Sequence, residues 1–272
     1  MKNIAVVFGG YSSEYNVSVK SAKFIYDNLK DNSDWNIYEI CISKKEKTVK
    51  FKERIFDLDY QNFSFEIDGF IIKPDAVFNI IHGDPGENGV LAEILEKNQI
   101  PQTGCDNYVS QLTFNKKKFI EFVDNLDIPC AKQILLKKKE MIDIEKILET
   151  IKLPCIVKPN NGGSSIGVSK VNYIDELENK IKIAFNEDNQ VLIETFLEGQ
   201  EVSVGVINRN GKRIILPITE IISENELFDY NAKYLGESQE ITPANISKES
   251  ERLIHKYIAK IYDNIELNGI TR

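Results

Sequence analysis

The residues with the clearest chemical potential lie between Leu153 and Val171. There an apolar run ends at Lys158, a loop rich in glycine and serine spans residues 160–167, and a second apolar run follows directly. Consecutive backbone amides in such a loop can point the same way and form a concavity that binds anions. Glycine lets the backbone approach the anion closely, and serine hydroxyls add donors. The pattern favours a polyphosphate site.

This loop fits neither of the common nucleotide-binding patterns. A Walker A loop needs a lysine directly after its last glycine, whereas Val168 follows Gly167 here. The dinucleotide fingerprint should open a helix, whereas this loop lies between two predicted strands. By spacing alone, a plain hairpin loop and a phosphate clamp are equally compatible with the pattern. Lys158 favours the clamp, because a partly buried ammonium group needs an anionic partner.

Two candidate residues lie in the first third of the chain. Glu14 follows Gly9-Gly10 at a predicted helix start, where a carboxylate could equally serve only to stabilise the helix dipole. His82 precedes a glycine at a strand end, and by itself it is as compatible with a structural role as with a functional one. Both follow predicted parallel strands, and ligands of such sheets bind beyond the carboxyl ends of the strands.

Further candidates have ordinary explanations when each is taken alone. Lys116 belongs to a run of three lysines near a helix start, which is more often a solvated face. Glu194 and Glu201 flank a short turn after an apolar strand, where surface charge is the simple explanation. The segment 229–234 holds two tyrosines and a lysine, so it is either a structural loop or a lid that closes over a reactive intermediate.

The elements that must position these residues alternate between strands and helices, which indicates an α/β protein. In the first third we predict strands at 4–8, 38–42 and 76–81 and helices at 17–29 and 90–97. Further on we predict a helix at 114–126, strands at 156–158 and 167–171, a helix capped by Asp175, strands at 191–194 and 202–206, a hairpin turn at Asn210-Gly211 into 213–222, a helix after Ser247 and a strand from Asn268. The expected division is 1–104, 105–190 and 191–272.

Composition excludes several classes of protein. The 272 residues carry a formal net charge of -8, which argues against nonspecific nucleic-acid binding. The four cysteines form no CxxC pair and only two histidines are present, so a zinc site is not expected. The N-terminal apolar run is too short for a signal peptide, and no apolar segment is long enough to cross a bilayer. We expect a cytoplasmic protein.

In their order along the chain, these segments resemble the D-alanine–D-alanine ligases of the ATP-grasp superfamily. The resemblance runs from Ile4 to Arg272. It is carried by Gly9-Gly10-Tyr11-Ser12-Ser13-Glu14 with Val17-Ser18, His82-Gly83 with Gly86-Glu87-Asn88-Gly89, Asn115-Lys116, Val157-Lys158-Pro159 with Gly163-Ser164-Ser165-Ile166-Gly167, Leu192-Ile193-Glu194, Glu201, Asp229-Tyr230 with Ala232-Lys233-Tyr234, and Gly269 with Arg272. It implies an ATP-grasp fold of three α/β subdomains, the first with a parallel sheet.

The resemblance also implies a nucleotide site between two sheets. Lys116 and Lys158 would contact the phosphates of ATP, and Ser165 would belong to the loop that covers them. The segment 194–197, which includes Glu194, Phe196 and Leu197, would hold adenine. Glu201 would hold the ribose, and Lys233 would contact ATP from the lid.

For the amino-acid substrates, the resemblance assigns a second group of residues. Glu14 would bind the ammonium group of the first D-alanine, with His82 near the same substrate. Ser164 and Tyr234 would link to Glu14 in a hydrogen-bonded set that closes the lid. Arg272 would stabilise the tetrahedral intermediate. The implied reaction joins two D-alanines through a D-alanyl phosphate for peptidoglycan synthesis, in a cytoplasmic homodimer.

One departure from the family concerns magnesium. The family continues beyond the position of Arg272 with the acidic residues and the asparagine that bind two magnesium ions. We therefore expect no metal ligand within the 272 residues and little or no turnover from them alone. Two alternatives stay open, a ligase that joins D-alanine to D-lactate and a non-catalytic ATP-binding form. Tyr234 argues against the first, because lactate-using members usually carry phenylalanine there.

Overall fold

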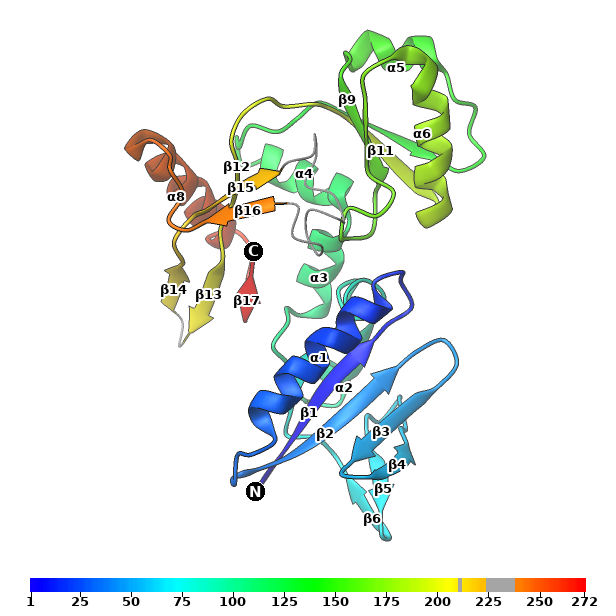
Figure 1. Ribbon diagram of the computed structural model, residues 1–272, viewed down its shortest axis with the longest axis vertical. Coiled ribbons are helices and arrows are strands. Elements are labelled where there is room, and N and C mark those ends of the chain that lie inside the picture. The colour runs from blue at the N-terminus through cyan, green and yellow to red at the C-terminus, as the bar shows by residue number, and fades with distance from the viewer. Residues whose placement is uncertain (210–211, 224–237) are drawn as a thin grey trace. The chain divides into compact units, whose positions relative to one another are not determined.

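The computed structural model describes residues 1–209, 212–223 and 238–272. These residues divide into two compact units (Figure 1). The first unit comprises residues 1–114 and 267–271, and the second comprises residues 115–266 together with Arg272. Among the helices in the described ranges, none is long and apolar enough to span a bilayer.

The first unit is built on a five-stranded sheet with the order β4-β3-β2-β1-β7. Its strands are β1 (Lys2–Gly9), β2 (Trp35–Ile42), β3 (Lys47–Phe51), β4 (Arg54–Asp57) and β7 (Ala76–Asn79). β1 runs parallel to both β2 and β7, whereas β3 and β4 are added in antiparallel fashion. The predicted parallel sheet is therefore confirmed for the adjacent strands β2, β1 and β7, and β3 and β4 extend it in antiparallel fashion.

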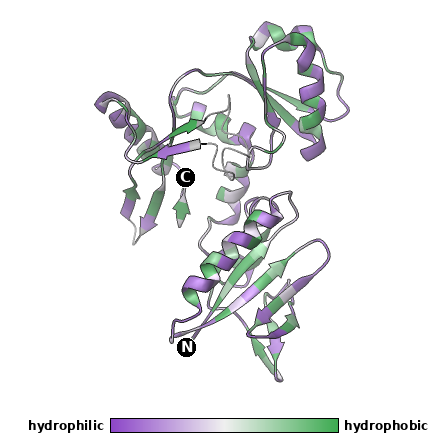
Figure 2. Ribbon diagram, viewed as in Figure 1, coloured by the Kyte–Doolittle hydropathy of each residue, from purple (hydrophilic) through white to green (hydrophobic). Residues whose placement is uncertain are grey.

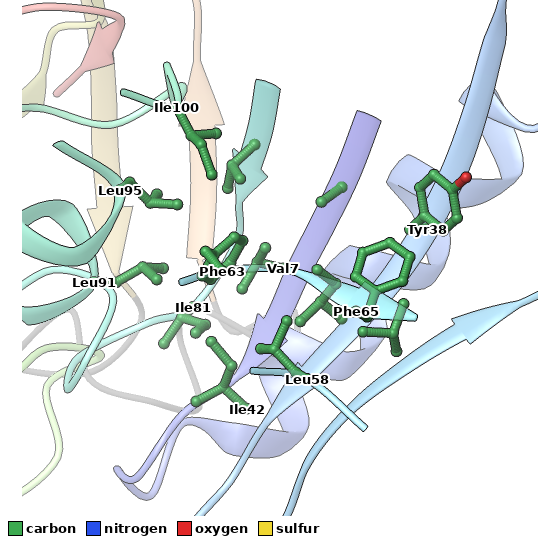
Figure 3. Packing of buried hydrophobic residues seen from close by; sticks show 14 residues of the cluster. Val7, Tyr38, Ile42, Leu58, Phe63, Phe65, Ile81, Leu91, Leu95 and Ile100 are labelled. Carbon is green, nitrogen blue, oxygen red and sulfur yellow. The ribbon is translucent and has the colours of Figure 1, made fainter. Parts of the chain in front are cut away.

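Residues alternate between the two faces of β1, and each face is covered. Val6 packs with Ala22 of α1 (Tyr15–Leu29), which lies along the sheet in Figure 1. Val7 points to the other face, into a core that includes Leu91 and Leu95 of α2 (Val90–Lys97) and is drawn in Figure 3. This sandwich buries both faces, as expected for parallel strands.

The rest of the first unit includes a hairpin and a returning segment. The hairpin joins β5 (Phe65–Ile67) to β6 (Phe70–Ile72), and α3 (Asn107–Phe114) ends the first stretch of chain. The returning segment contains β17 (Ile270–Thr271), close to the predicted final strand. Within it, the carbonyl oxygen of Asn268 accepts a hydrogen bond from Cys105 Sγ at 3.4 Å.

The second unit contains an antiparallel four-stranded sheet with the order β10-β9-β11-β8. Its strands are β8 (Gln133–Lys137), β9 (Cys155–Pro159), β10 (Ser169–Val171) and β11 (Gln190–Thr195). Residues of α5 (Ile144–Thr150) and α6 (Ile174–Glu187) pack against one face through a core that includes Val157 and Ile193. Figure 2 shows hydrophilic and hydrophobic residues alternating along α6. The domain boundary expected between residues 190 and 191 falls at the start of β11, so it would separate most of this strand from the rest of its sheet.

The remaining elements of the second unit include α8 (Lys248–Tyr262), the longest of its described helices. The other elements are α4 (Lys116–Asp124) and a sheet of β12 (Glu201–Ser203), β15 (Thr219–Ser223) and β16 (Ser238–Ile241). The strands β13 (Val206–Arg209) and β14 (Lys212–Ile215) are antiparallel neighbours. Ser247 accepts a hydrogen bond from Ser250 N at 3.0 Å, so the predicted cap of this last helix is confirmed.

Several predicted boundaries were wrong, for local reasons. The helix expected at 114–126 is interrupted at Asn115, whose backbone is extended and whose side chain caps α4. Asp175 lies inside the first turn of α6, and Tyr173 occupies the cap position. The strands expected at 202–206 and 213–222 are each divided in two. Asn210 and Gly211 lie outside the described residues, but the pairing of Arg209 with Lys212 fits the predicted hairpin.

Candidate active site

At the carboxyl end of β1, the backbone turns in a way that only glycine tolerates easily. Gly9 and Gly10 have φ values of 104° and 100°, in a region that side chains disfavour. A Cβ atom on Gly9 would lie 2.5 Å from the carbonyl oxygen of Ile42. Gly10 N donates to that same oxygen at 2.7 Å. The close approach of β1 and β2 therefore explains why the turn requires glycine.

Glu14 and His82 are brought to the same edge of this sheet, as predicted. Glu14 is 3% exposed and occupies the cap position of α1. Its backbone N–H donates to Ser12 Oγ at 3.2 Å, and Ser12 Oγ donates to the carbonyl oxygen of His82 at 2.9 Å. A Cβ atom on Gly83 would lie 3.4 Å from Glu14 Oε2, so the carboxylate faces the loop after His82. A buried carboxylate here can attract a small ammonium group.

Two residues that we had assigned no role hold this edge together. Ser18 is fully buried, and its Oγ accepts from Gly9 N at 2.9 Å while donating to the carbonyl oxygen of Ile80 at 2.7 Å. Glu87 Oε2 accepts from Gly83 N at 2.6 Å. Through its two hydrogen bonds, Ser18 connects the end of β1 to the end of β7. The hydrogen bond of Glu87 stabilises the loop that carries His82. Their only signal in the sequence was their presence in the matching motifs.

Next to Glu14, Tyr15 is kept neutral. Its hydroxyl lies 3.5 Å from Cys41 Sγ. This hydrogen bond, together with burial, raises the pKa of Tyr15 to about 12. Burial also raises the pKa of the Cys41 thiol. The pair therefore adds no charge at neutral pH to the surroundings of Glu14.

In the second unit, Lys158 and Glu194 form an ion pair across neighbouring strands. Lys158 Nζ lies 2.5 Å from Glu194 Oε1, and the two side chains are 19% and 15% exposed. Because Val157 and Ile193 point toward the helices, the alternation of β9 and β11 places Lys158 and Glu194 on the opposite face of the sheet. The anionic partner expected for a partly buried Lys158 is thus Glu194, a residue for which we had predicted contact with adenine.

The glycine–serine loop is an irregular connection between β9 and β10, and four of its residues have positive φ. These are Gly162 at 136°, Ser164 at 47°, Ser165 at 57° and Gly167 at 73°. Each serine in this region costs about 1–2 kcal/mol of backbone strain. Backbone strain of this kind persists where the surrounding structure imposes it, and ligand-binding loops are one such setting.

Lys116 contacts this loop directly. It is the first residue of α4, and its Nζ donates to the carbonyl oxygen of Gly162 at 2.7 Å. The structure therefore brings Lys116 and the loop after Lys158 together within one unit. This arrangement was not derivable from the run of three lysines.

The segment predicted to hold adenine follows β11. Phe196 receives Lys170 Nζ over its ring, 4.4 Å from the centroid. Leu197 is exposed, and Glu201 is exposed at the start of β12. Gln133 of β8 lies opposite Glu194, and its Oε1 is buried with no hydrogen-bond partner in the part of the chain that the structure describes. The sequence did not point to Lys170 and Gln133, because only the strand register places them on the same sheet face as Lys158 and Glu194.

Other predicted site residues cannot be placed in this way. Lys233 and Tyr234 lie outside the described residues. Arg272 is exposed at the end of the second unit. Within residues 1–209, 212–223 and 238–272, no group of three or more His, Cys, Asp or Glu side chains could hold a metal ion.

Solved structures with this arrangement define the class of protein. D-alanyl-alanine synthetase A from Vibrio cholerae is 28% identical with a TM-score of 0.84, over 99% of this chain and 82% of the other. The VanG D-Ala:D-Ser ligase from Enterococcus faecalis is 30% identical with a TM-score of 0.81, over 99% and 84%. The parallel-sheet unit, followed by a unit whose sheet carries Lys158 and the glycine–serine loop, is that of an ATP-grasp ligase.

Sequence comparisons narrow this class to one family. Residues 3–105 match the D-ala D-ala ligase N-terminus, and residues 122–272 match the D-ala D-ala ligase C-terminus. The D-alanine–D-alanine ligase of Flavobacterium psychrophilum is 47% identical over 99% of this chain and 82% of its own length. That of Christiangramia forsetii is 45% identical over 100% and 83%. The chain belongs to the D-alanine–D-alanine ligase family.

Proposed function

We propose that the protein joins two D-alanines to D-alanyl-D-alanine at the expense of ATP, through a D-alanyl phosphate, for peptidoglycan precursor synthesis. The observation that carries this proposal is the pair of lysines at one glycine–serine loop. Lys158 lies on the strand that enters the loop, and Lys116 Nζ donates to the loop at Gly162. Two cations around an irregular loop suit a polyphosphate chain. Family membership supplies the identity of the nucleotide and of the amino acids.

For the nucleotide, we assign the phosphates to Lys116 and Lys158, with Ser165 in the covering loop and Lys233 in the lid. The segment 194–197, with Glu194, Phe196 and Leu197, would hold adenine, and Glu201 the ribose. Among the described residues, the buried Oε1 of Gln133 beside Glu194 has no hydrogen-bond partner, which supports a base with an amino group, since such a group would satisfy this acceptor.

For the amino acids, we assign the ammonium group of the first D-alanine to Glu14, with His82 near the same substrate. The burial of Glu14 supports this role, because an unscreened carboxylate attracts a cation strongly. Ser164 and Tyr234 would complete a hydrogen-bonded set with Glu14, and Arg272 would stabilise the tetrahedral intermediate.

The reaction makes clear demands on these residues. A carboxylate oxygen of D-alanine attacks the γ-phosphorus of ATP, and ADP leaves. The amine of the second D-alanine, having lost a proton, then attacks the acyl carbon, and inorganic phosphate leaves. Lys116 and Lys158 reduce the repulsion between carboxylate and triphosphate, and anchoring of the ammonium group aligns the acyl carbon. The described residues offer no metal cluster, so we derive no step through magnesium.

The test is the release of phosphate from ATP with D-alanine, combined with mass spectrometry of the product. From the 272 residues alone we expect little or no turnover. With D-alanine as the only amino acid, we expect a chain of the family's full length to make D-alanyl-D-alanine, and to make no mixed product when D-lactate or D-serine is added as the second substrate. A mixed product would instead indicate a D-lactate or D-serine ligase, and ATP binding without any product would indicate a non-catalytic form. We also propose a cytoplasmic homodimer that serves cell wall biogenesis and cell shape, which cell fractionation and light scattering can test.

A further inference from the structure

The start of α4 has an unusual set of hydrogen-bond partners. The first N–H groups of a helix have no partner within the helix, and many proteins use them to bind anions. Here Lys116 N donates to the carbonyl oxygen of Asn160 at 3.1 Å, and Lys117 N donates to Asn160 Oδ1 at 2.9 Å. Lys118 N donates to Asn115 Oδ1 at 3.0 Å. The leading N–H groups of α4 are thus bound to protein oxygens, and Asn160 takes two of them.

The backbone and side-chain polar groups of Asn160 all form hydrogen bonds with neighbouring residues. It is 0% exposed, its backbone N–H donates to the carbonyl oxygen of Gln190 at 2.9 Å, and its Nδ2 donates to Gln190 Oε1 at 2.8 Å. Each of its four polar groups therefore has a partner. Through these bonds, Asn160 connects the end of β9 to the start of β11 and to the start of α4.

A second layer of contacts holds the next residue. Asn161 N and Nδ2 both donate to Asp188 Oδ2, at 2.7 and 2.8 Å. Asn161 Oδ1 accepts from Asn115 Nδ2 at 3.1 Å. The entry to the glycine–serine loop is therefore attached on one side to the end of α6 and on the other to the residue that caps α4.

These contacts determine where the Lys116 side chain can act. With the N–H groups of the first turn already bonded, α4 can present positive charge to a phosphate only through its side chains and the residual helix dipole. Lys116 Nζ lies at the loop, 2.7 Å from the carbonyl oxygen of Gly162. The distance between Lys116 Nζ and the loop therefore depends on the hydrogen bonds that join the start of α4 to Asn160.

We propose that Asn160 is a positioning residue of the phosphate subsite, which caps α4 from a distance and thereby places Lys116 against the loop that follows Lys158. The proposal rests on the proposed function, since it requires that the loop and Lys116 hold the phosphates of ATP. Asn160 touches no substrate itself. It acts through the backbone of Lys116 and Lys117.

The first test compares ATP with adenosine, which lacks phosphates, in binding titrations of the full chain. For Asn160→Ala we expect ATP affinity to fall about tenfold, the size of one charge-assisted contact, and adenosine affinity to stay within about twofold. Asn189→Ala, an exposed asparagine of the neighbouring loop, is the matched control and should change neither. Equal weakening of ATP and adenosine, or no weakening of either, would overturn the proposal.

The second test asks whether Asn160 acts through Lys116. If it does, Asn160→Ala should weaken ATP binding little further in a Lys116→Met background, because the lysine that it positions is already gone. Fully additive losses would contradict this. If Asn160→Ala does not fold, Gln190→Ala removes only the partner of Asn160 Nδ2, and we expect the same selective loss at smaller amplitude. Failure of the unaltered chain to bind ATP would refute the proposed function. Normal ATP binding by both the unaltered chain and Asn160→Ala would refute this inference alone.

Discussion

Lys158 and Glu194 lie on adjacent strands of the second unit and form an ion pair on the sheet face opposite α5 and α6. Their separation of 36 positions in the sequence is closed by the antiparallel register of β9 and β11. In this pair, the lysine proposed for phosphate and the glutamate proposed for adenine hold each other in place. If both residues bind the nucleotide as proposed, ATP must either contact the intact ion pair or replace part of the contact between the two side chains.

The first prediction concerns removal of either partner. Glu194→Gln leaves the Lys158 ammonium without its counterion, and we expect a loss of about 1–3 kcal/mol in the free energy of unfolding, below the cost for a fully buried pair. ATP should raise the melting temperature of this variant more than that of the unaltered chain, since phosphates resupply negative charge. Lys158→Met should lose ATP stabilisation altogether. Thermal melts with and without ATP measure both, and equal shifts in all three proteins would contradict the assignment.

The second prediction concerns Lys170. Its ammonium group lies over the Phe196 ring, and such contacts contribute about 0.5–2 kcal/mol. Because Phe196 belongs to the proposed adenine segment, Lys170→Met should weaken ATP and adenosine by the same factor, in contrast to Asn160→Ala. Titration with both ligands measures this. A loss confined to ATP would instead place Lys170 at the phosphates.

The third prediction concerns the segment that returns to the first unit. Gly269 has a φ of 73°, and a Cβ atom there would meet the carbonyl oxygen of Thr103 at a separation that no real contact allows. Gly269→Ala should therefore destabilise this unit by more than the strain of positive φ alone. Gly69→Ala is the matched control, because Gly69 has a φ of 85° and open space around it. We expect about 1–2 kcal/mol for the control and clearly more for Gly269→Ala, measured by urea unfolding. Equal losses would contradict a packing role for Gly269.

The fourth prediction concerns stability at alkaline pH. Burial raises the pKa of the Cys155 thiol from 9.0 to about 11. Between these values the folded chain keeps a proton that the unfolded chain has lost, so the free energy of unfolding falls as pH rises from 9 to 11. Below pH 9 this contribution is fully present. The loss from Cys155 alone is at most about 2–3 kcal/mol.

The measurement for this fourth prediction is urea unfolding of the unaltered chain and of Cys155→Ala at several pH values. The alanine variant starts from a lower stability because it leaves a small cavity. Its stability should nevertheless fall less steeply between pH 9 and 11. Parallel curves for the two proteins would show that Cys155 does not titrate in this window. The thiol should also resist alkylation near neutral pH, because the thiolate is the reactive form.

Local patterns predicted much of the fold. Apolar spacing predicted α1 and α2 to within two residues at either end, and Ser247 correctly marked the start of α8. Glycine pairs and strand ends correctly placed the loops that carry Glu14 and His82 at one sheet edge. Short edge strands such as β4 and β8 were missed, because brief apolar runs look alike in strands and loops. The break at Asn115 was also missed, since its cap and its bond to Asn161 come from a distant loop.

The sequence by itself determined which chemical groups are available: a lysine beside a glycine–serine loop, a glutamate after a glycine turn, and a matching order of motifs. These features depend on residue type and on spacing along a few turns or strands, where local rules hold. Only the tertiary structure decided that Lys158 pairs with Glu194 and that Asn160 caps α4. Those contacts join residues 36 and 43 positions apart, and strand register and packing, rather than local propensity, determine which distant groups meet.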